Sequence, residues 1–144
     1  MGFDVREHSA LIYDSGTEPF TGTTLQGIGQ AVVGVLENPV ATANRFVKVR
    51  SVQTCQNELL KAFERAAGNK WSVRRSTTEE LLESGRRKKA EGDGGWIADL
   101  VVAQLYEEGV GRSVVAPSWE EADSPLLGVA EETVDSIAEK ALAG

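Results

Sequence analysis

The feature that most constrains the fold is the segment 44–68, in which an apolar run leads directly into an amphipathic helical pattern. The run Phe46-Val47-Lys48-Val49 is short and mostly apolar, and we predict a buried strand there. The following helix is expected to start near Thr54, a favourable N-cap residue, and to end at Gly68. A strand followed by a helix is half of an α/β unit, so this segment predicts an α/β protein.

The remaining elements are short and separated by turn signals. A strand is predicted at residues 9–13, where Asp14-Ser15-Gly16 closes an apolar run, and another at 71–74. Capping-box spacings and apolar periodicity predict helices that start near Thr23 and Thr77, and further helices over 96–105 and 134–142. Strands separated by helices favour parallel pairing. The fold class is therefore α/β, with a small parallel-type sheet of about three strands and four or five helices.

The helix predicted after Thr23 is unusual because it contains Gly27, Gly29 and Gly34. Each glycine weakens a helix by roughly 1 kcal/mol relative to alanine, so we expect some of them to allow close approach of another element. Their spacing does not match a phosphate-binding turn, which needs glycines between a strand and a helix. The apolar face of this helix is predicted from its periodicity to consist of Leu25, Ile28, Val32, Val35 and Leu36.

Composition limits the function classes. A chain of 144 residues is treated as one domain, 1–144, with a net charge of −7. This charge argues against nucleic acid and anionic membranes as partners, because phosphates are held mainly by lysine and arginine. Three observations predict a cytoplasmic protein. The chain has a single cysteine, Cys55, it shows no signal-peptide pattern, and it has no apolar run long enough for a membrane span. With one histidine and one cysteine, no metal site is expected.

Several segments resemble a known family. They are Phe20-Thr21-Gly22-Thr23-Thr24-Leu25-Gln26-Gly27-Ile28-Gly29-Gln30-Ala31-Val32, Asn44-Arg45-Phe46, Gln56-Asn57-Glu58-Leu59-Leu60 and Gly68-Asn69-Lys70-Trp71. In order and spacing they resemble the C-terminal part of NmrA-like, isoflavone-reductase-like proteins, which are atypical short-chain dehydrogenase/reductases. The resemblance covers most of residues 9–110 and implies the substrate lobe of such a protein.

In that family the N-terminal half is a Rossmann unit that binds NAD(P). No Gly-x-Gly-x-x-Gly segment precedes residue 9, and the family's catalytic Lys or Tyr-x-x-x-Lys position would fall in that half. The resemblance therefore transfers no catalytic residue to this chain, and no cofactor is predicted. An isolated lobe would expose apolar surface, so a homodimer, or a complex with another chain, is expected.

Candidate site residues follow from position and chemistry. Tyr13 and Asp14 lie at the carboxyl end of a predicted strand, where ligands bind in open α/β sheets, although a local turn role for Asp14 is also open. His8 is the only histidine, and Asp99 and Tyr106 lie on the strongest amphipathic helix. Trp96 and Phe20 are predicted to contact the substrate, because aromatic side chains suit pocket walls. The predicted catalytic residues are therefore His8, Tyr13, Asp14, Asp99 and Tyr106.

Three functions are compatible with these residues. The first is a cofactor-independent isomerase, cyclase or dehydratase of fungal secondary metabolism that reuses the substrate pocket. The second is a non-catalytic ligand- or protein-binding regulatory module, as the resemblance to NmrA-like regulators implies. The third is a degenerate product of a reductase gene. We take the first as the working hypothesis, with a small molecule as substrate.

Overall fold

A three-stranded mixed sheet forms one end of the molecule. The computed structural model describes residues 2–143, and its sheet has the order β1 (Phe3–Asp4), β2 (Ser9–Tyr13), β5 (Ser72–Ser76). Strands β2 and β5 are parallel, with Ser9 opposite Ser72 and Tyr13 opposite Ser76, whereas β1 runs antiparallel to β2. Helix α3 (Gln56–Ala67) lies in the connection that parallel pairing of β2 and β5 requires.

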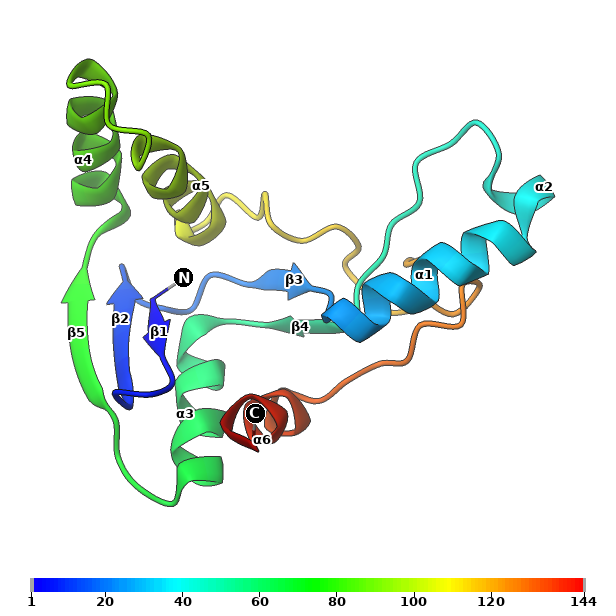
Figure 1. Cartoon of the computed structure of the whole chain (residues 1–144), viewed down its shortest axis with the longest axis horizontal. Coiled ribbons are helices and arrows are strands. Elements are labelled where there is room, and N and C mark those ends of the chain that lie inside the picture. The colour runs from blue at the N-terminus through cyan, green and yellow to red at the C-terminus, as the bar shows by residue number, and fades with distance from the viewer. Residues whose placement is uncertain (1, 144) are drawn as a thin grey trace.

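Two pairs of helices pack around this sheet. Helices α3 and α6 (Val134–Ala143) lie together against the sheet, and α4 (Thr78–Ala90) and α5 (Trp96–Tyr106) lie beyond the carboxyl ends of β2 and β5 (Figure 1). The buried core between the sheet and α3 and α6 consists of Ala10, Ile12, Ala62, Phe63, Trp71 and Ala138. The ends of β2 and β5 therefore face α4 and α5.

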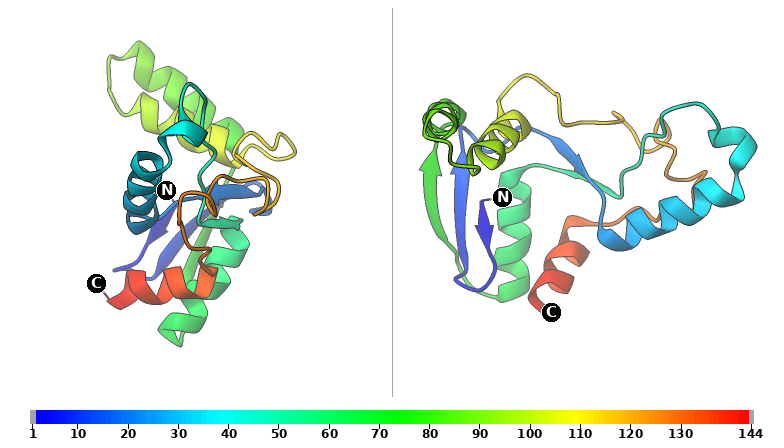
Figure 2. Two further views of the ribbon diagram at one scale, coloured as in Figure 1. Left: turned by 90° about the vertical axis from the view of Figure 1, so that its right-hand side faces the viewer. Right: turned by 45° about the horizontal axis from the view of Figure 1, so that its top comes forward.

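A two-stranded antiparallel ribbon leads away from this body. Strands β3 (Phe20–Gly22) and β4 (Val52–Thr54) pair with each other and reach α1 (Leu25–Glu37) and α2 (Pro39–Thr42) at the far end of the molecule (Figures 1 and 2). A separate core cluster of Ala31, Leu127 and Val129 holds α1 against the segment before α6.

The α/β class is confirmed, and most predicted elements are present within a few residues. The strand at 9–13 and the helices after Thr77, over 96–105 and over 134–142 are found. Thr77 and Glu80 form the predicted capping box, in which the Thr77 hydroxyl accepts a hydrogen bond from the Glu80 amide at 3.1 Å. The sheet differs from the prediction because only one of its two strand pairs is parallel.

The strand predicted at residues 46–49 is wrong. Its polar backbone groups contact a loop and not a sheet: the Lys48 amide donates to the Asp123 carboxylate at 2.7 Å, and the Lys48 carbonyl accepts from the Asp123 amide at 2.8 Å. Phe46 is 97% exposed. The strand that leads to α3 is instead β4, which begins at Val52, and Cys55 in place of Thr54 is the N-cap residue of α3.

Helix α1 is oriented differently from the prediction. Thr24, one residue after the expected cap, accepts a hydrogen bond from the Gly27 amide at 3.2 Å and caps the helix. Its buried positions are Gly27, Ala31 and Gly34, whereas four of the five residues predicted to form the buried face are exposed, namely Leu25, Ile28, Val32 and Leu36. The expected close approach at glycines is confirmed at Gly34, where a Cβ would lie 2.6 Å from the Cα of Leu127.

Across residues 2–143, none of the helices has both the length and the apolar character that crossing a bilayer demands.

Candidate functional site

An aromatic cluster lies at the carboxyl end of β2. Tyr13, the last residue of β2, stacks on Tyr106, the last residue of α5, with ring centroids 5.8 Å apart. Phe20 at the start of β3 meets the Tyr106 ring edge-on at 5.7 Å. All three are buried, and Leu11, Leu59, Leu81, Val102 and Leu105 pack around them. The structure thus brings together three of the predicted site residues from three different elements.

A charged pair lies next to this cluster. The Lys88 ammonium on α4 lies 2.8 Å from the Asp99 carboxylate on α5, and this hydrogen bond is the main reason that the pKa of Asp99 is lowered. Asp99 therefore stays ionised near neutral pH. Burial raises the pKa of Tyr13, and the negative charge of Asp99 raises it further, whereas Lys88 lowers it. The Tyr13 hydroxyl is therefore close enough to Asp99 and Lys88 for both charges to change its pKa.

The Tyr106 hydroxyl is held in its neutral form. Its side chain is 3% exposed, and burial, with a smaller effect from Tyr13, raises the pKa of Tyr106 from 10.0 to about 12. A phenol with a raised pKa can donate a hydrogen bond at neutral pH but is a poor general base.

This shift predicts a loss of stability in alkali. Between pH 10 and 12 the unfolded chain loses the Tyr106 proton while the folded chain keeps it, so the free energy of unfolding falls as pH rises. The two-unit difference corresponds to about 2–3 kcal/mol at most. Urea denaturation at pH 9 and about pH 12 should show this fall, and Tyr106→Phe, which keeps the ring, should remove that part of it. Equal pH slopes for both proteins would contradict the assignment.

A pocket adjoins the cluster on the side of Phe20. We call it the β3–α5 pocket. Its volume is about 460 Å³, and it is lined by Phe20, Thr21, Gly22, Val101, Gln104, Leu105, Arg112 and Ser113. Its surface is mainly apolar, with a few polar side chains. Binding sites for small organic molecules usually have this composition. Tyr106 contacts Phe20, which lines the pocket, so the aromatic cluster lies next to it.

Three other predicted residues lie elsewhere or make structural contacts. His8 lies in the turn before β2, at the opposite end of the strand from Tyr13, and stacks on Trp71 with ring centroids 5.4 Å apart. Trp96 begins α5, about 15 Å along the helix from Tyr106, and the Lys89 ammonium lies 5.0 Å from its ring centre. The Asp14 carboxylate accepts hydrogen bonds from the Thr78 amide at 3.0 Å and the Thr78 hydroxyl at 2.6 Å, which holds the start of α4.

Sequence reasoning missed several polar residues near the site. Gln56, which is fully buried, accepts a hydrogen bond from the Tyr13 amide at 2.9 Å and donates to the Leu11 carbonyl at 3.1 Å, so it links α3 to β2. Gln104 and Arg112 line the β3–α5 pocket. Gln104 lies on the amphipathic helix predicted over 96–105, but only the position of β3 reveals that this side of the helix borders a pocket.

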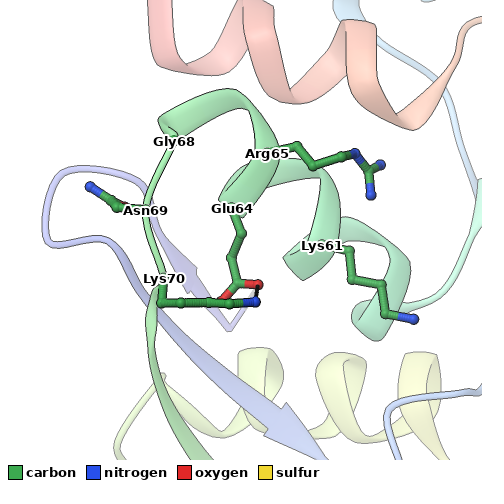
Figure 3. A pocket seen from close by; sticks show the side chains of 6 residues that line it. All are labelled: Lys61, Glu64, Arg65, Gly68, Asn69 and Lys70. Atoms are coloured by element: carbon green, nitrogen blue, oxygen red, sulfur yellow. Dashed lines mark hydrogen bonds and ion pairs between the residues drawn. The ribbon is translucent and has the colours of Figure 1, made fainter.

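A second pocket, of about 410 Å³, lies at the carboxyl end of α3 (Figure 3). It is lined by Lys61, Glu64, Arg65, Gly68, Asn69 and Lys70. Glu64 and Lys70 point toward each other and form an ion pair at 2.7 Å, and Glu64 also accepts from the Trp71 amide at 3.2 Å. These contacts join the end of α3 to β5, and none of the predicted site residues reaches this pocket.

Two sequence features considered for metal or phosphate binding have structural surroundings that can be described. Within residues 2–143 no group of three or more histidine, cysteine, aspartate or glutamate side chains is arranged to hold a metal ion. Gly27 and Gly34 lie inside α1 and face Thr23, Val129 and Leu127, so they serve packing and do not form a turn around a pyrophosphate. We therefore assign no step through a nicotinamide cofactor to these residues.

The chain is similar to fungal oxidoreductases. Oxidoreductase poxI of Penicillium oxalicum is 60% identical over 142 residues, which are 99% of this chain and 45% of that protein. Oxidoreductase aprR of Aspergillus flavus is 31% identical over 80 residues, which are 56% of this chain and 27% of that protein. The chain thus spans less than half the length of these relatives. No protein-family model matches it.

The fold is similar to part of a larger α/β enzyme. The crystal structure of a nucleoside-diphosphate-sugar epimerase from Staphylococcus aureus superposes with a TM-score of 0.61 at 20% identity, over 94% of this chain and 44% of the epimerase. This likeness concerns the fold. The assignment to the NmrA-like proteins and to the short-chain dehydrogenase/reductases stays a prediction.

Proposed function

We propose that this chain is the small-molecule-binding part of a protein related to fungal oxidoreductases and that its ligand occupies the β3–α5 pocket. The observation that carries this proposal is the mainly apolar 460 Å³ pocket beside the buried aromatic cluster of Tyr13, Phe20 and Tyr106. Similarity to poxI and aprR supports an enzyme-related role.

The pocket lining indicates the class of ligand. Phe20, Val101 and Leu105 favour an apolar or aromatic body. Thr21 already bonds to the Ser113 carbonyl and the Val115 amide, and Arg112 is paired with Glu107 at 3.1 Å. We therefore assign to Gln104 the hydrogen bond that orients the ligand, for example by donation to a carbonyl or hydroxyl oxygen.

A pair of substitutions on one helix tests this proposal. Val101→Trp should fill the pocket and weaken binding of aromatic ketones and alcohols by at least about ten-fold, because a bulky ring excludes the ligand body. Ile97→Trp, one turn earlier on α5 and equally exposed at 55%, is the control and should leave binding unchanged. Ligand-detected NMR with a panel of such compounds is the measurement. Equal binding by both variants would contradict the pocket assignment.

The second candidate is the cofactor-independent isomerase, cyclase or dehydratase chemistry predicted from the sequence. It is favoured by the raised pKa of Tyr13 and Tyr106, because both phenols stay neutral and a neutral phenol can donate a hydrogen bond that stabilises developing negative charge without a hydride carrier. Under this hypothesis a compound bound in the β3–α5 pocket is converted without added nucleotide. The role in fungal secondary metabolism and a non-catalytic regulatory role both remain predictions, separated by whether turnover occurs.

We also propose that the chain associates with a second copy of itself. Helix α1 supports this, because its Leu25 and Leu36 side chains are 88% and 75% exposed while its opposite face is packed on Leu127 and Val129. A helix that is apolar on both faces is normally covered on both faces.

A further inference from the structure

We propose a second ligand site, for a small carboxylate or phosphate anion, in a pocket around Arg50. This Arg50 pocket has a volume of about 390 Å³ and is lined by Thr17, Pro19, Arg50, Gln53, Thr54, Cys55, Glu58 and Pro117. It shares no lining residue with the β3–α5 pocket, and more of its surface is polar than apolar. The proposal therefore stands independently of the function proposed above.

Arg50 is a buried cation without an acidic partner. The residue is 5% exposed, and within residues 2–143 its guanidinium makes no ion pair. One Nη donates to the Gln53 side-chain oxygen, the guanidinium lies 5.9 Å from the Trp119 ring centre, and the buried Nε has no hydrogen-bond partner among the described residues. Burying a guanidinium is unfavourable unless its charge and donors are matched, so an anion in the pocket would supply what the protein does not.

Among the described residues, the carboxylates of the surrounding glutamates do not form an ion pair with Arg50. Glu18 is used by the backbone amides of Gly109 and Gly111, which donate to it at 2.7 and 2.8 Å. Glu58 lines the pocket and accepts from the Thr54 hydroxyl at 3.0 Å. Hydrogen bonds from its own amide and from Ser118 lower the pKa of Glu120, and the charge of Arg50 adds to this effect, but no ion pair joins Glu120 to Arg50 among residues 2–143.

The amino end of α3 adds to the attraction for an anion. Thr54 and Cys55, which line the pocket, precede the first residue of this 12-residue helix, and Cys55 as N-cap makes no side-chain capping hydrogen bond. The helix dipole is positive at this end and favours a bound anion, as the Arg50 charge does. Carboxylates and phosphates accept two parallel hydrogen bonds from a guanidinium, so they match Arg50 better than a halide does.

Titration with inorganic phosphate tests the site. The Arg50 Nε–H resonance in ¹H–¹⁵N spectra should move saturably with phosphate and should not do so with sodium chloride at matched ionic strength. A resonance that is unmoved by phosphate, or that follows chloride equally, would overturn the proposal without requiring any variant to fold. Acetate in a parallel titration distinguishes a carboxylate preference from a phosphate preference.

Three variants assign the effect to the pocket. Arg50→Met should weaken phosphate binding by about ten-fold, because it removes the charge and the planar donors. Glu58→Gln should tighten it roughly three-fold by removing a like charge. Arg75→Met, at an exposed residue of β5, is the control for net charge and should change nothing. If Arg75→Met weakens binding as much as Arg50→Met does, or if Glu58→Gln has no effect, the site is not the Arg50 pocket.

Discussion

Replacing Gly34 with alanine is expected to destabilise the protein by about 2–3 kcal/mol. An added Cβ at this position would lie 2.6 Å from the Cα and 2.7 Å from the carbonyl carbon of Leu127, which are backbone atoms. Leu127 is itself buried and tied by its amide to the Asp123 and Ser124 carbonyls, so the neighbouring segment cannot easily move away. Urea denaturation followed by circular dichroism measures the change in the free energy of unfolding.

The same substitution five residues earlier is the matched control. A Cβ at Gly29 meets no atom within 4 Å, and the residue is exposed on the same helix. Gly29→Ala should therefore stabilise the protein by about 0.5–1 kcal/mol through helix propensity alone. Opposite signs for the two substitutions are expected, and a gain of stability in both would mean that α1 does not pack closely on Leu127.

Features that depend only on residues close together in the sequence were predictable. The capping box of Thr77 and Glu80, the strand at 9–13 and the glycine that ends α3 follow from local backbone chemistry. The α/β class follows from the alternation of such elements. These predictions did not require knowledge of which segments meet in space.

Features that depend on distant contacts were not predictable. Residues 46–49 have a strand-like pattern, but the backbone partner of Lys48 is Asp123, which lies 75 positions later in the chain. Helix α1 has larger apolar residues on one face, so periodicity assigns that face to the core, whereas the glycine face permits the closer contact with Leu127.

The candidate site was predictable in part, for the same reason. The rule that ligands bind beyond the carboxyl ends of strands pointed to Tyr13, and the amphipathic pattern pointed to Tyr106, but their stacking depends on how α5 returns to β2. Arg50 does not belong to any motif in the sequence. Its burial without an acidic partner becomes visible only when the Arg50 pocket is assembled from β4, α3 and three loops.

Charges on the exposed face of α1 are expected to break the proposed dimer. The parent protein should sediment as a dimer, and the double variant Leu25→Glu with Leu36→Glu should raise the dimer dissociation constant by at least about 100-fold, because two large apolar side chains per copy would lose their burial. A symmetric interface doubles this effect, since the same helix contributes from both copies. Ile97→Glu on α5, at an apolar position that is 55% exposed and lies outside this face, is the control and should remain dimeric. Sedimentation velocity and native mass spectrometry measure the dimer dissociation constant.

A parent protein that is monomeric at all concentrations would contradict the proposed dimer. It would mean that something other than a second copy covers the α1 face, and it would direct attention to the part of the fungal relatives that this chain does not match.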